Sequence, residues 1–328
     1  MSAAGLTLLL ASILFVAATW GPGLLRRAAP ALATIPRTAV FALAAGALAW
    51  MTTLFTLGPV IAWISTGPSW LPQPAADVCG QCLSAATPFG DSAVSLGIPA
   101  ILPLAFPALG AAAVLVGMAM EFALVRTSRL SSAAGLGEQA EQKILFGHSV
   151  RVVPDEIPYA YALPRRRGGV VVSSGACDRL SRDELRAVLG HERAHVQQHH
   201  HLVLTLLFGA TRFFTWVPLI AAIRDAIPLY LEIAADQEAK RDAGSPALAG
   251  ALLKLGSPSP TLRSNSAVLH ASVAGSGSER VRQLVGRPPP RNSTLLATGV
   301  AAYALSLAAA IAGIHWPYLA ALLAGCIS

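Results

Sequence analysis

The amino-acid sequence predicts a mostly α-helical polytopic membrane protein into which an α+β domain is inserted. Three observations support this fold class. Only 12% of the 328 residues are charged and the mean hydropathy is +0.57, which is too apolar for an ordinary soluble domain. Apolar stretches of about 20 residues, the length needed to cross a bilayer, recur along the chain. All 24 Lys and Arg residues fall in segments that these stretches place on one side of the membrane.

Four apolar stretches are expected to be transmembrane helices, at residues 4–25, 38–63, 98–125 and 294–314. The segment between the first two contains Arg26, Arg27 and Arg37, whereas the loop at 64–97 contains no Lys or Arg. Basic residues in short loops stay on the cytoplasmic side of a membrane. We therefore expect this loop and both chain termini to be extracytoplasmic.

The charge pattern divides the chain into three parts. We expect residues 1–125 to form three transmembrane helices with an extracytoplasmic loop at 64–97. Residues 126–293 should form a cytoplasmic domain, and 294–328 the fourth transmembrane helix with a short extracytoplasmic tail. Such a chain is a multi-pass protein of the cell membrane, with the lipid bilayer as its first partner. The pI of about 9.7 follows from the basic cytoplasmic side, and no motif predicts direct binding to nucleic acid.

The cytoplasmic domain is expected to begin with short strands. Runs of β-branched residues at 150–153 and 169–173 are bounded by Pro and Gly, which is typical of strands. An edge strand is indicated before Pro164, because Pro cannot donate a hydrogen bond to a central strand. Such a strand can hold an extended peptide by backbone pairing. The candidate substrate strand is Tyr159, Ala160, Tyr161, Ala162 and Leu163.

A metal-binding pattern lies on the helix that should begin at Ser181, whose spacing to Glu184 is that of a capping box. The segment 191–195 reads His-Glu-Arg-Ala-His. Residues four apart share a helix face, so His191 and His195 can bind one zinc ion. Glu192 is then placed to take a proton from water. The alternative is a solvated helix with two incidental histidines.

A zinc peptidase needs a third protein ligand, and the sequence offers two candidates. His201 follows His191 by the spacing of the metzincin pattern, but Gln198 stands where that pattern has a Gly that turns the chain. Glu232 can instead bind zinc while Asp236, four residues later on the same face, accepts a hydrogen bond from a ligand histidine. We favour Glu232; a surface helix with two ordinary carboxylates is the alternative.

A fifth apolar stretch, residues 202–223, lies between the two parts of this site. His195 and Glu232 must reach one metal ion, so a single membrane crossing between them is excluded. Two crossings would need roughly 40 residues plus a turn, and Arg212 interrupts the stretch. We therefore expect this segment to pack within the cytoplasmic domain or to lie at the membrane interface.

Three segments resemble the BlaR/MecR-type family of integral-membrane metallopeptidases, at 169–175, 180–195 and 232–236. The sequence is similar, more distantly, to the HtpX-type and CAAX prenyl-protease families. The resemblance implies a gluzincin domain with one zinc ion per chain, held by His191, His195 and Glu232, with Asp236 bonded to a ligand. It implies Glu192 as general base, and hence a zinc metalloendopeptidase with HExxH and ExxxD motifs.

The resemblance also implies a role in signal transduction, through cleavage of a BlaI-type transcriptional repressor or of the chain itself. The loop at 256–278 is our candidate for self-cleavage, and the oxyanion-stabilising donor is left open among Tyr159, Tyr161, His270 and Arg280. The β-lactam receptors of the family carry a C-terminal penicillin-binding sensor domain, which we expect this chain to lack.

Two other functions remain open from the sequence. One is an HtpX-type protease of membrane-protein quality control, which shares the site but not the target. The other is a non-catalytic membrane scaffold or metal-handling protein that uses the histidines at 199–201. The oligomeric state is also open, a homodimer included.

Overall fold

The computed structural model describes residues 3–66, 101–135, 140–163 and 169–255, with residues 299 and 302. Most of the loop expected at 64–97 lies outside the described residues. So do the expected fourth span, apart from those two positions, and the candidate self-cleavage loop at 256–278.

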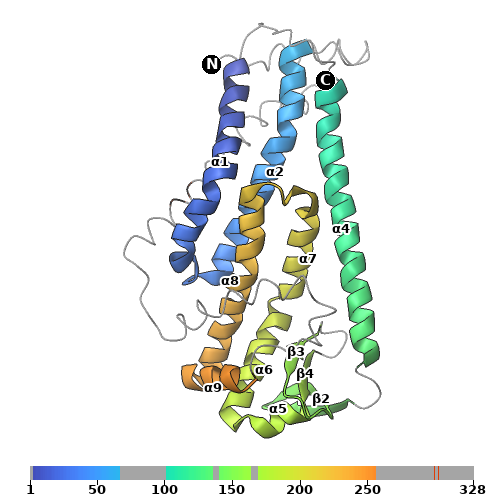
Figure 1. Ribbon diagram of the computed structural model, residues 1–328, viewed down its shortest axis with the longest axis vertical. Helices are drawn as coiled ribbons and strands as arrows, with labels where there is room; N and C mark the ends of the chain where they lie inside the picture. Colours follow the sequence, from blue (N-terminus) through green and yellow to red (C-terminus); the bar gives the residue numbers. More distant parts are fainter. Residues whose placement is uncertain are drawn as a thin grey trace, which may run out of the picture.

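Three long helices form one end of the molecule (Figure 1). They are α1 (Ala3–Leu32), α2 (Pro36–Thr66) and α4 (Ile101–Gly135). Each contains a segment long and apolar enough to cross a membrane, and these segments are Thr7–Leu32, Pro36–Gly58 and Ala105–Thr127. Three of the four spans expected from the sequence are therefore present as candidate spans in the described part of the chain.

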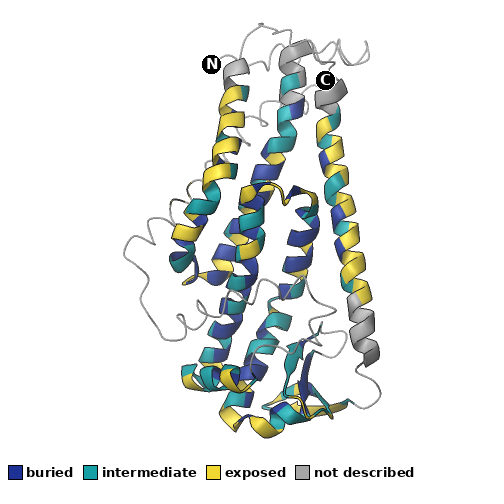
Figure 2. Ribbon diagram, in the orientation of Figure 1, coloured by how far each residue is buried: buried dark blue, intermediate teal, exposed yellow. Residues whose placement is uncertain are grey.

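The outward faces of these helices carry exposed apolar side chains, as the exposed outer surfaces in Figure 2 illustrate. Phe15, Phe41 and Leu115 are each about 70% exposed. Large apolar side chains at this density are unfavourable in water but match a hydrocarbon environment. The exposure pattern agrees with helices that face lipid.

The other end of the molecule contains a four-stranded sheet in the order β1-β2-β4-β3. Its members are β1 (Glu141–Leu145), β2 (His148–Val153), β3 (Ala160–Ala162) and β4 (Val170–Ser173). The strands expected at 150–153 and 169–173 become β2 and β4, which pair in parallel. Both central strands bury Val side chains in a core shared with the following helices.

The short strand β3 is an edge strand, as the sequence predicted. It pairs antiparallel with β4, with Tyr161 opposite Val171. The Leu163 N–H donates to the Gly169 carbonyl and the Tyr159 carbonyl accepts from Ser173. Because backbone groups alternate in direction along an antiparallel strand, the N–H and C=O groups of Ala160 and Ala162 point to the free edge.

Helix α6 (Arg182–Gln197) follows the short helix α5 (Ser174–Arg179) and begins at the expected capping box. The Glu184 N–H donates to Ser181 Oγ over 3.3 Å, and the Ser181 N–H donates to Glu184 Oε2 over 2.7 Å. Helix α9 (Ser245–Leu255) packs across α6, and Lys254 pairs with the same Glu184 over 2.6 Å. These contacts fix the start of the helix that carries the histidines.

The fifth apolar stretch forms a helical hairpin, made of α7 (His200–Ala210), the 3₁₀ turn η3 (Arg212–Phe214) and the first part of α8 (Pro218–Ala243). It rises between the long helices and returns (Figure 1). With 11 residues, α7 is roughly 16 Å long and too short to cross a bilayer.

The hairpin returns to the end of the molecule from which it starts, and its neighbours differ from those we expected. It packs neither wholly inside the domain nor flat at an interface: α7 contacts α4, and α8 contacts α1 and α2. Ile220, Ile223 and Ile227 of α8 are buried in a core that also includes Leu14 and Trp50 of the long helices. Hydrophobicity alone cannot distinguish these partners, because either environment removes the same side chains from water.

Helices α4 and α7 approach so closely that only glycine fits at the contact. A Cβ atom at Gly117 would clash with the Gly209 carbonyl oxygen, and one at Gly209 would lie 2.9 Å from Met118 Cα. The same two elements are joined by Arg212, whose guanidinium lies 3.2 Å from the buried Glu121 carboxylate. Arg212, the charged residue that interrupts the fifth apolar stretch, is thus paired with Glu121 of the candidate span Ala105–Thr127.

Candidate metal centre

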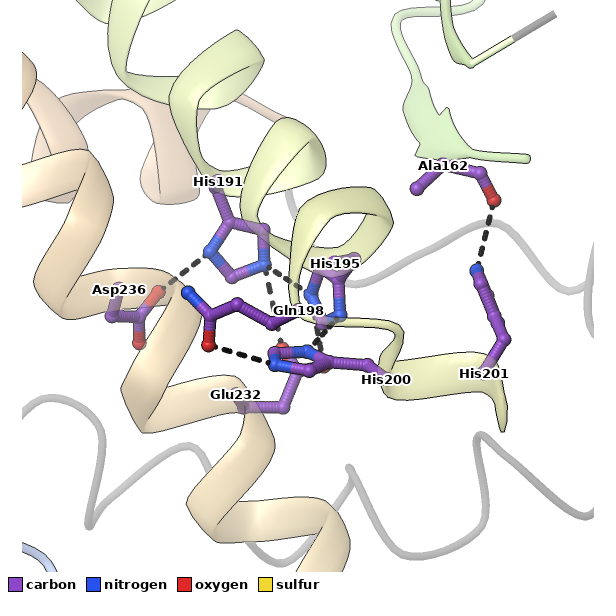
Figure 3. A network of polar contacts seen from close by, with 8 residues as sticks. All are labelled: Ala162, His191, His195, Gln198, His200, His201, Glu232 and Asp236. Atoms are coloured by element: carbon purple, nitrogen blue, oxygen red, sulfur yellow. Dashed lines mark hydrogen bonds and ion pairs between the residues drawn. The ribbon is translucent and has the colours of Figure 1, made fainter. Parts of the chain in front are cut away.

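Two helices bring the predicted ligands together. His191 and His195 lie on adjacent turns of α6, and Glu232 and Asp236 on adjacent turns of α8 (Figure 3). The helices pack closely because their contact is made of small residues: a Cβ atom at Gly190 would lie 3.5 Å from Ala239 Cα. Short helix separation places side chains of moderate length within reach of one point.

The nearest donor atoms of His191, His195 and Glu232 form a compact triangle. The two histidine Nε2 atoms are 3.1 Å apart, and the Glu232 carboxylate oxygens lie 3.5 Å from His191 Nε2 and 3.4 Å from His195 Nε2. Zinc–ligand bonds of about 2.0–2.1 Å in a tetrahedron require ligand atoms roughly 3.3–3.4 Å apart. The triangle therefore has the size and the donor types that zinc needs.

Asp236 lies behind His191. Its Oδ1 is 2.9 Å from His191 Nδ1, close enough to accept a hydrogen bond, although the alignment in the structure is poor. Asp236 is itself buried, at 5% exposed. A carboxylate on the far nitrogen of a ligand histidine fixes the ring and leaves Nε2 free for metal.

A second chain of contacts supports His195 and involves a residue that the sequence did not single out as a partner. His200 Nδ1 lies 2.8 Å from His195 Nδ1, and His200 Nε2 lies 3.1 Å from Gln198 Oε1. Gln198 Oε1 also accepts from Arg37 Nε of α2 over 3.2 Å. His200 itself is buried, at 2% exposed.

This chain has one consistent set of proton positions if His195 Nε2 binds a metal. His195 must then carry its proton on Nδ1 and donate it to His200 Nδ1. His200 must carry its own proton on Nε2 and donate it to Gln198. Gln198 Oε1, the acceptor of that bond, also accepts from Arg37 Nε, so every proton in the chain of hydrogen bonds is assigned to one atom.

The balance of burial and neighbouring charges raises the pKa of His191 and lowers the pKa values of His195 and His200. Burial lowers the pKa of His191, but Asp236 and Glu232 outweigh it and raise that pKa to about 10. Burial lowers the pKa of His195 to about 3 and that of His200 to about 4, although Glu232 opposes both shifts. His195 and His200 are therefore neutral at physiological pH, the state that metal binding and proton acceptance require.

The other candidate residues lie around this centre. His201 turns away from the triangle, and its Nε2 is 3.2 Å from the Ala162 carbonyl oxygen on the free edge of β3 (Figure 3). Glu192 is half-buried on α6, directly after His191. The rings of Tyr159 and Tyr161 stack 5.9 Å apart, and burial raises the pKa of each to about 12. His270 and Arg280 lie outside the described residues.

Two histidines and a glutamate at zinc-ligand spacing form a candidate zinc site, in a chain whose described residues include three helices long and apolar enough to cross a membrane. Residues 127–234 match the model of peptidase family M48. The matches with known proteins support the M48 membrane metallopeptidase family for this chain and do not show the narrower BlaR/MecR type.

The relatives are proteases of the HtpX type. The chain is 34% identical to an HtpX protease homologue of Moorella thermoacetica, over 32% of this chain and 48% of that relative. It is 31% identical to the HtpX protease of Photorhabdus laumondii, over 33% of this chain and 37% of the relative. The matches thus span less than half the length of these curated relatives. No solved structure gave a significant match.

Proposed function

We propose that the chain is a zinc-dependent endopeptidase that hydrolyses peptide bonds at the cytoplasmic membrane face. The observation that carries the proposal is the triangle of His191, His195 and Glu232 donor atoms, with Asp236 and His200 behind the two imidazoles. Structural zinc sites have four protein ligands, whereas catalytic sites have three and an open position. The described residues offer three.

The proposed mechanism assigns each residue a task. Bound zinc supplies polarisation of the scissile carbonyl and acidifies water. Glu192 takes the proton of the attacking water and passes it to the leaving amine. The outer edge of β3 holds the substrate in an extended conformation by backbone hydrogen bonds, through the N–H and C=O of Ala160 and the N–H of Ala162, whose carbonyl is contacted by His201. The stacked Tyr159 and Tyr161 remain protonated, since their pKa values are raised to about 12, and so keep hydroxyl donors available.

Two substrate classes are compatible with this chemistry. The resemblance to HtpX-type proteases suggests misfolded membrane proteins as substrates, and a site built between candidate spans and a small sheet suits them. The BlaR/MecR-type resemblance instead suggests a BlaI-type repressor or the chain itself. Incubation of the purified chain with an unfolded membrane-protein reporter and with a repressor of this type would separate the two by the products formed.

The peptidase itself is tested with Glu192→Gln. The variant should keep about one zinc per chain and lose peptide hydrolysis by a factor of 10² or more, since general-base catalysis contributes about that much. Asp183→Asn, which removes an exposed carboxylate of the same helix as Glu192, is the matched control and should stay active. If Glu192→Gln cleaves at the wild-type rate, the chain is a scaffold or metal-handling protein and not a peptidase.

A further inference from the structure

A cavity of about 890 Å³ lies on the side of α6 away from α8. Its wall comes from three sources: the end of the third candidate span, strands β1, β2 and β4, and the α6–α7 junction. None of the described residues that line it belongs to β3, although the lining residue His201 contacts the Ala162 carbonyl of that strand. It borders the metal centre only at His195.

The lining is strongly cationic. Its described residues include Arg126 of α4, Arg151 of β2 and Arg193 of α6, together with His148, His199 and His201, and none of these described lining residues is Asp or Glu. The Arg193 guanidinium lies 2.7 Å from His148 Nε2. Guanidinium groups in such a cavity favour an anion with several oxygen atoms.

Five other basic side chains of the described residues are paired with acidic groups. Arg37, Arg212, Arg241, Lys143 and Lys254 each have a carboxylate within ion-pair distance. Among the residues that the structure describes, none of the ion pairs includes Arg126, Arg151 or Arg193. The cavity therefore concentrates positive charge that the described part of the chain does not neutralise.

Another part of the lining is apolar and comes from the third candidate span and the start of α7. Phe122 and Val125 come from the last turns of the candidate span Ala105–Thr127, and Leu202 from the start of α7. Phe122 is 45% and Leu202 46% exposed. An apolar wall next to a cationic wall, at the level where a candidate span ends, has the polarity of a phospholipid: acyl chain on one side, phosphate on the other.

We propose that this cavity binds an anionic phospholipid from the leaflet that faces the domain. The lipid phosphate contacts Arg126, Arg151 and Arg193, and the part of the acyl chains nearest the headgroup packs on Phe122 and Leu202. A free phosphate would leave the apolar wall without a partner. A peptide substrate would need backbone pairing with β3, and none of the described residues that line the cavity belongs to β3. Because Arg193 lies within the 191–195 metal motif, an occupied cavity links the lipid to the metal helix.

The test is native mass spectrometry of the full-length chain in detergent, titrated with phosphatidylglycerol and, separately, phosphatidylcholine. Wild type should bind phosphatidylglycerol at least tenfold more tightly. Arg126→Gln with Arg151→Gln should weaken that binding about 25-fold, from roughly fivefold for each arginine near an anionic lipid. Arg126→Lys with Arg151→Lys keeps the charge and should retain most of it, which guards against a variant that fails to fold.

The matched control is Arg179→Gln with Arg182→Gln, which removes the same charge from exposed positions outside the cavity and should leave binding unchanged. Equal binding of the two lipids, or wild-type binding by the Arg126/Arg151 double variant, would overturn the proposal. So would competition by millimolar inorganic phosphate, which would identify a free anion as the ligand. Displacement of the lipid by an acidic peptide that itself binds more tightly would assign the cavity to substrate instead.

Discussion

Removal of the His200 side chain should weaken zinc binding although His200 is not one of the proposed ligands. The His200→Ala variant removes the acceptor that lies 2.8 Å from His195 Nδ1. His195 then loses the partner that fixes its ring and its tautomer. Loss of such a partner costs about 10- to 100-fold in metal affinity, or roughly 1.4–2.7 kcal/mol.

The assay is zinc competition against a chelator of known affinity, with the detergent-purified chain at neutral pH. His201→Ala is the control, because that neighbouring imidazole contacts the Ala162 carbonyl and not a ligand histidine; its zinc affinity should match wild type. His200→Asn, whose amide oxygen can replace the lost acceptor, should recover part of the affinity. Thermal unfolding of the metal-free variants separates this effect from the loss of a buried side chain.

A zinc affinity of His200→Ala within twofold of wild type, in a chain that unfolds normally, would contradict the reasoning. It would mean that packing alone orients His195, or that His195 does not bind through Nε2. The same result would remove the reason for the proton positions assigned to Gln198 and Arg37.

Three further predictions concern stability. Burial lowers the pKa of His200 to about 4 from its ordinary 6.5, so on acidification the unfolded chain binds a proton at His200 before the folded chain does. Metal-free wild type should therefore lose thermal stability as pH falls from about 6.5 to about 5. The His200→Asn variant should lose less over the same range. Gly209→Ala would place a Cβ atom 2.9 Å from Met118 Cα and force α4 and α7 apart. The midpoint of thermal unfolding should fall by several degrees. An unchanged midpoint would contradict the close contact of these two helices. Ser181→Ala removes one acceptor of the capping box and should cost about 1 kcal/mol in denaturant unfolding, whereas Ser181→Thr should cost less.

Much of the fold was readable from the sequence because the relevant signals are local. Hydropathy located the three long helices, the Ser181–Glu184 spacing placed the start of α6, and the residue before Pro164 marked an edge strand. The proposed ligand set was also readable, since i and i+4 positions on two helices suffice to present His191, His195 and Glu232. Each of these inferences needs only periodicity or a short motif.

The sequence did not predict which helices α7 and α8 pack against, and it did not predict that His200 contacts the ligand His195. An apolar helix is equally stabilised by a domain core or by transmembrane helices, so periodicity does not name its neighbours. The histidine run gives no indication of which ring turns inward. That choice depends on His199, which adopts a left-handed backbone conformation with φ 53° and redirects the chain so that His200 faces His195 while His201 faces β3.

The path of α8 has a consequence for any attempt to divide this protein. One half of the helix carries Glu232 and Asp236, and the other half is wedged among α1 and α2. A fragment cut after the third long helix would retain every proposed ligand yet expose the isoleucine-rich face of α8 to water, and it would lose Arg37 from the far end of the His200 chain. Bilayer and metal centre are thus parts of one cooperative unit, and a soluble fragment should be a poor substitute for the whole chain.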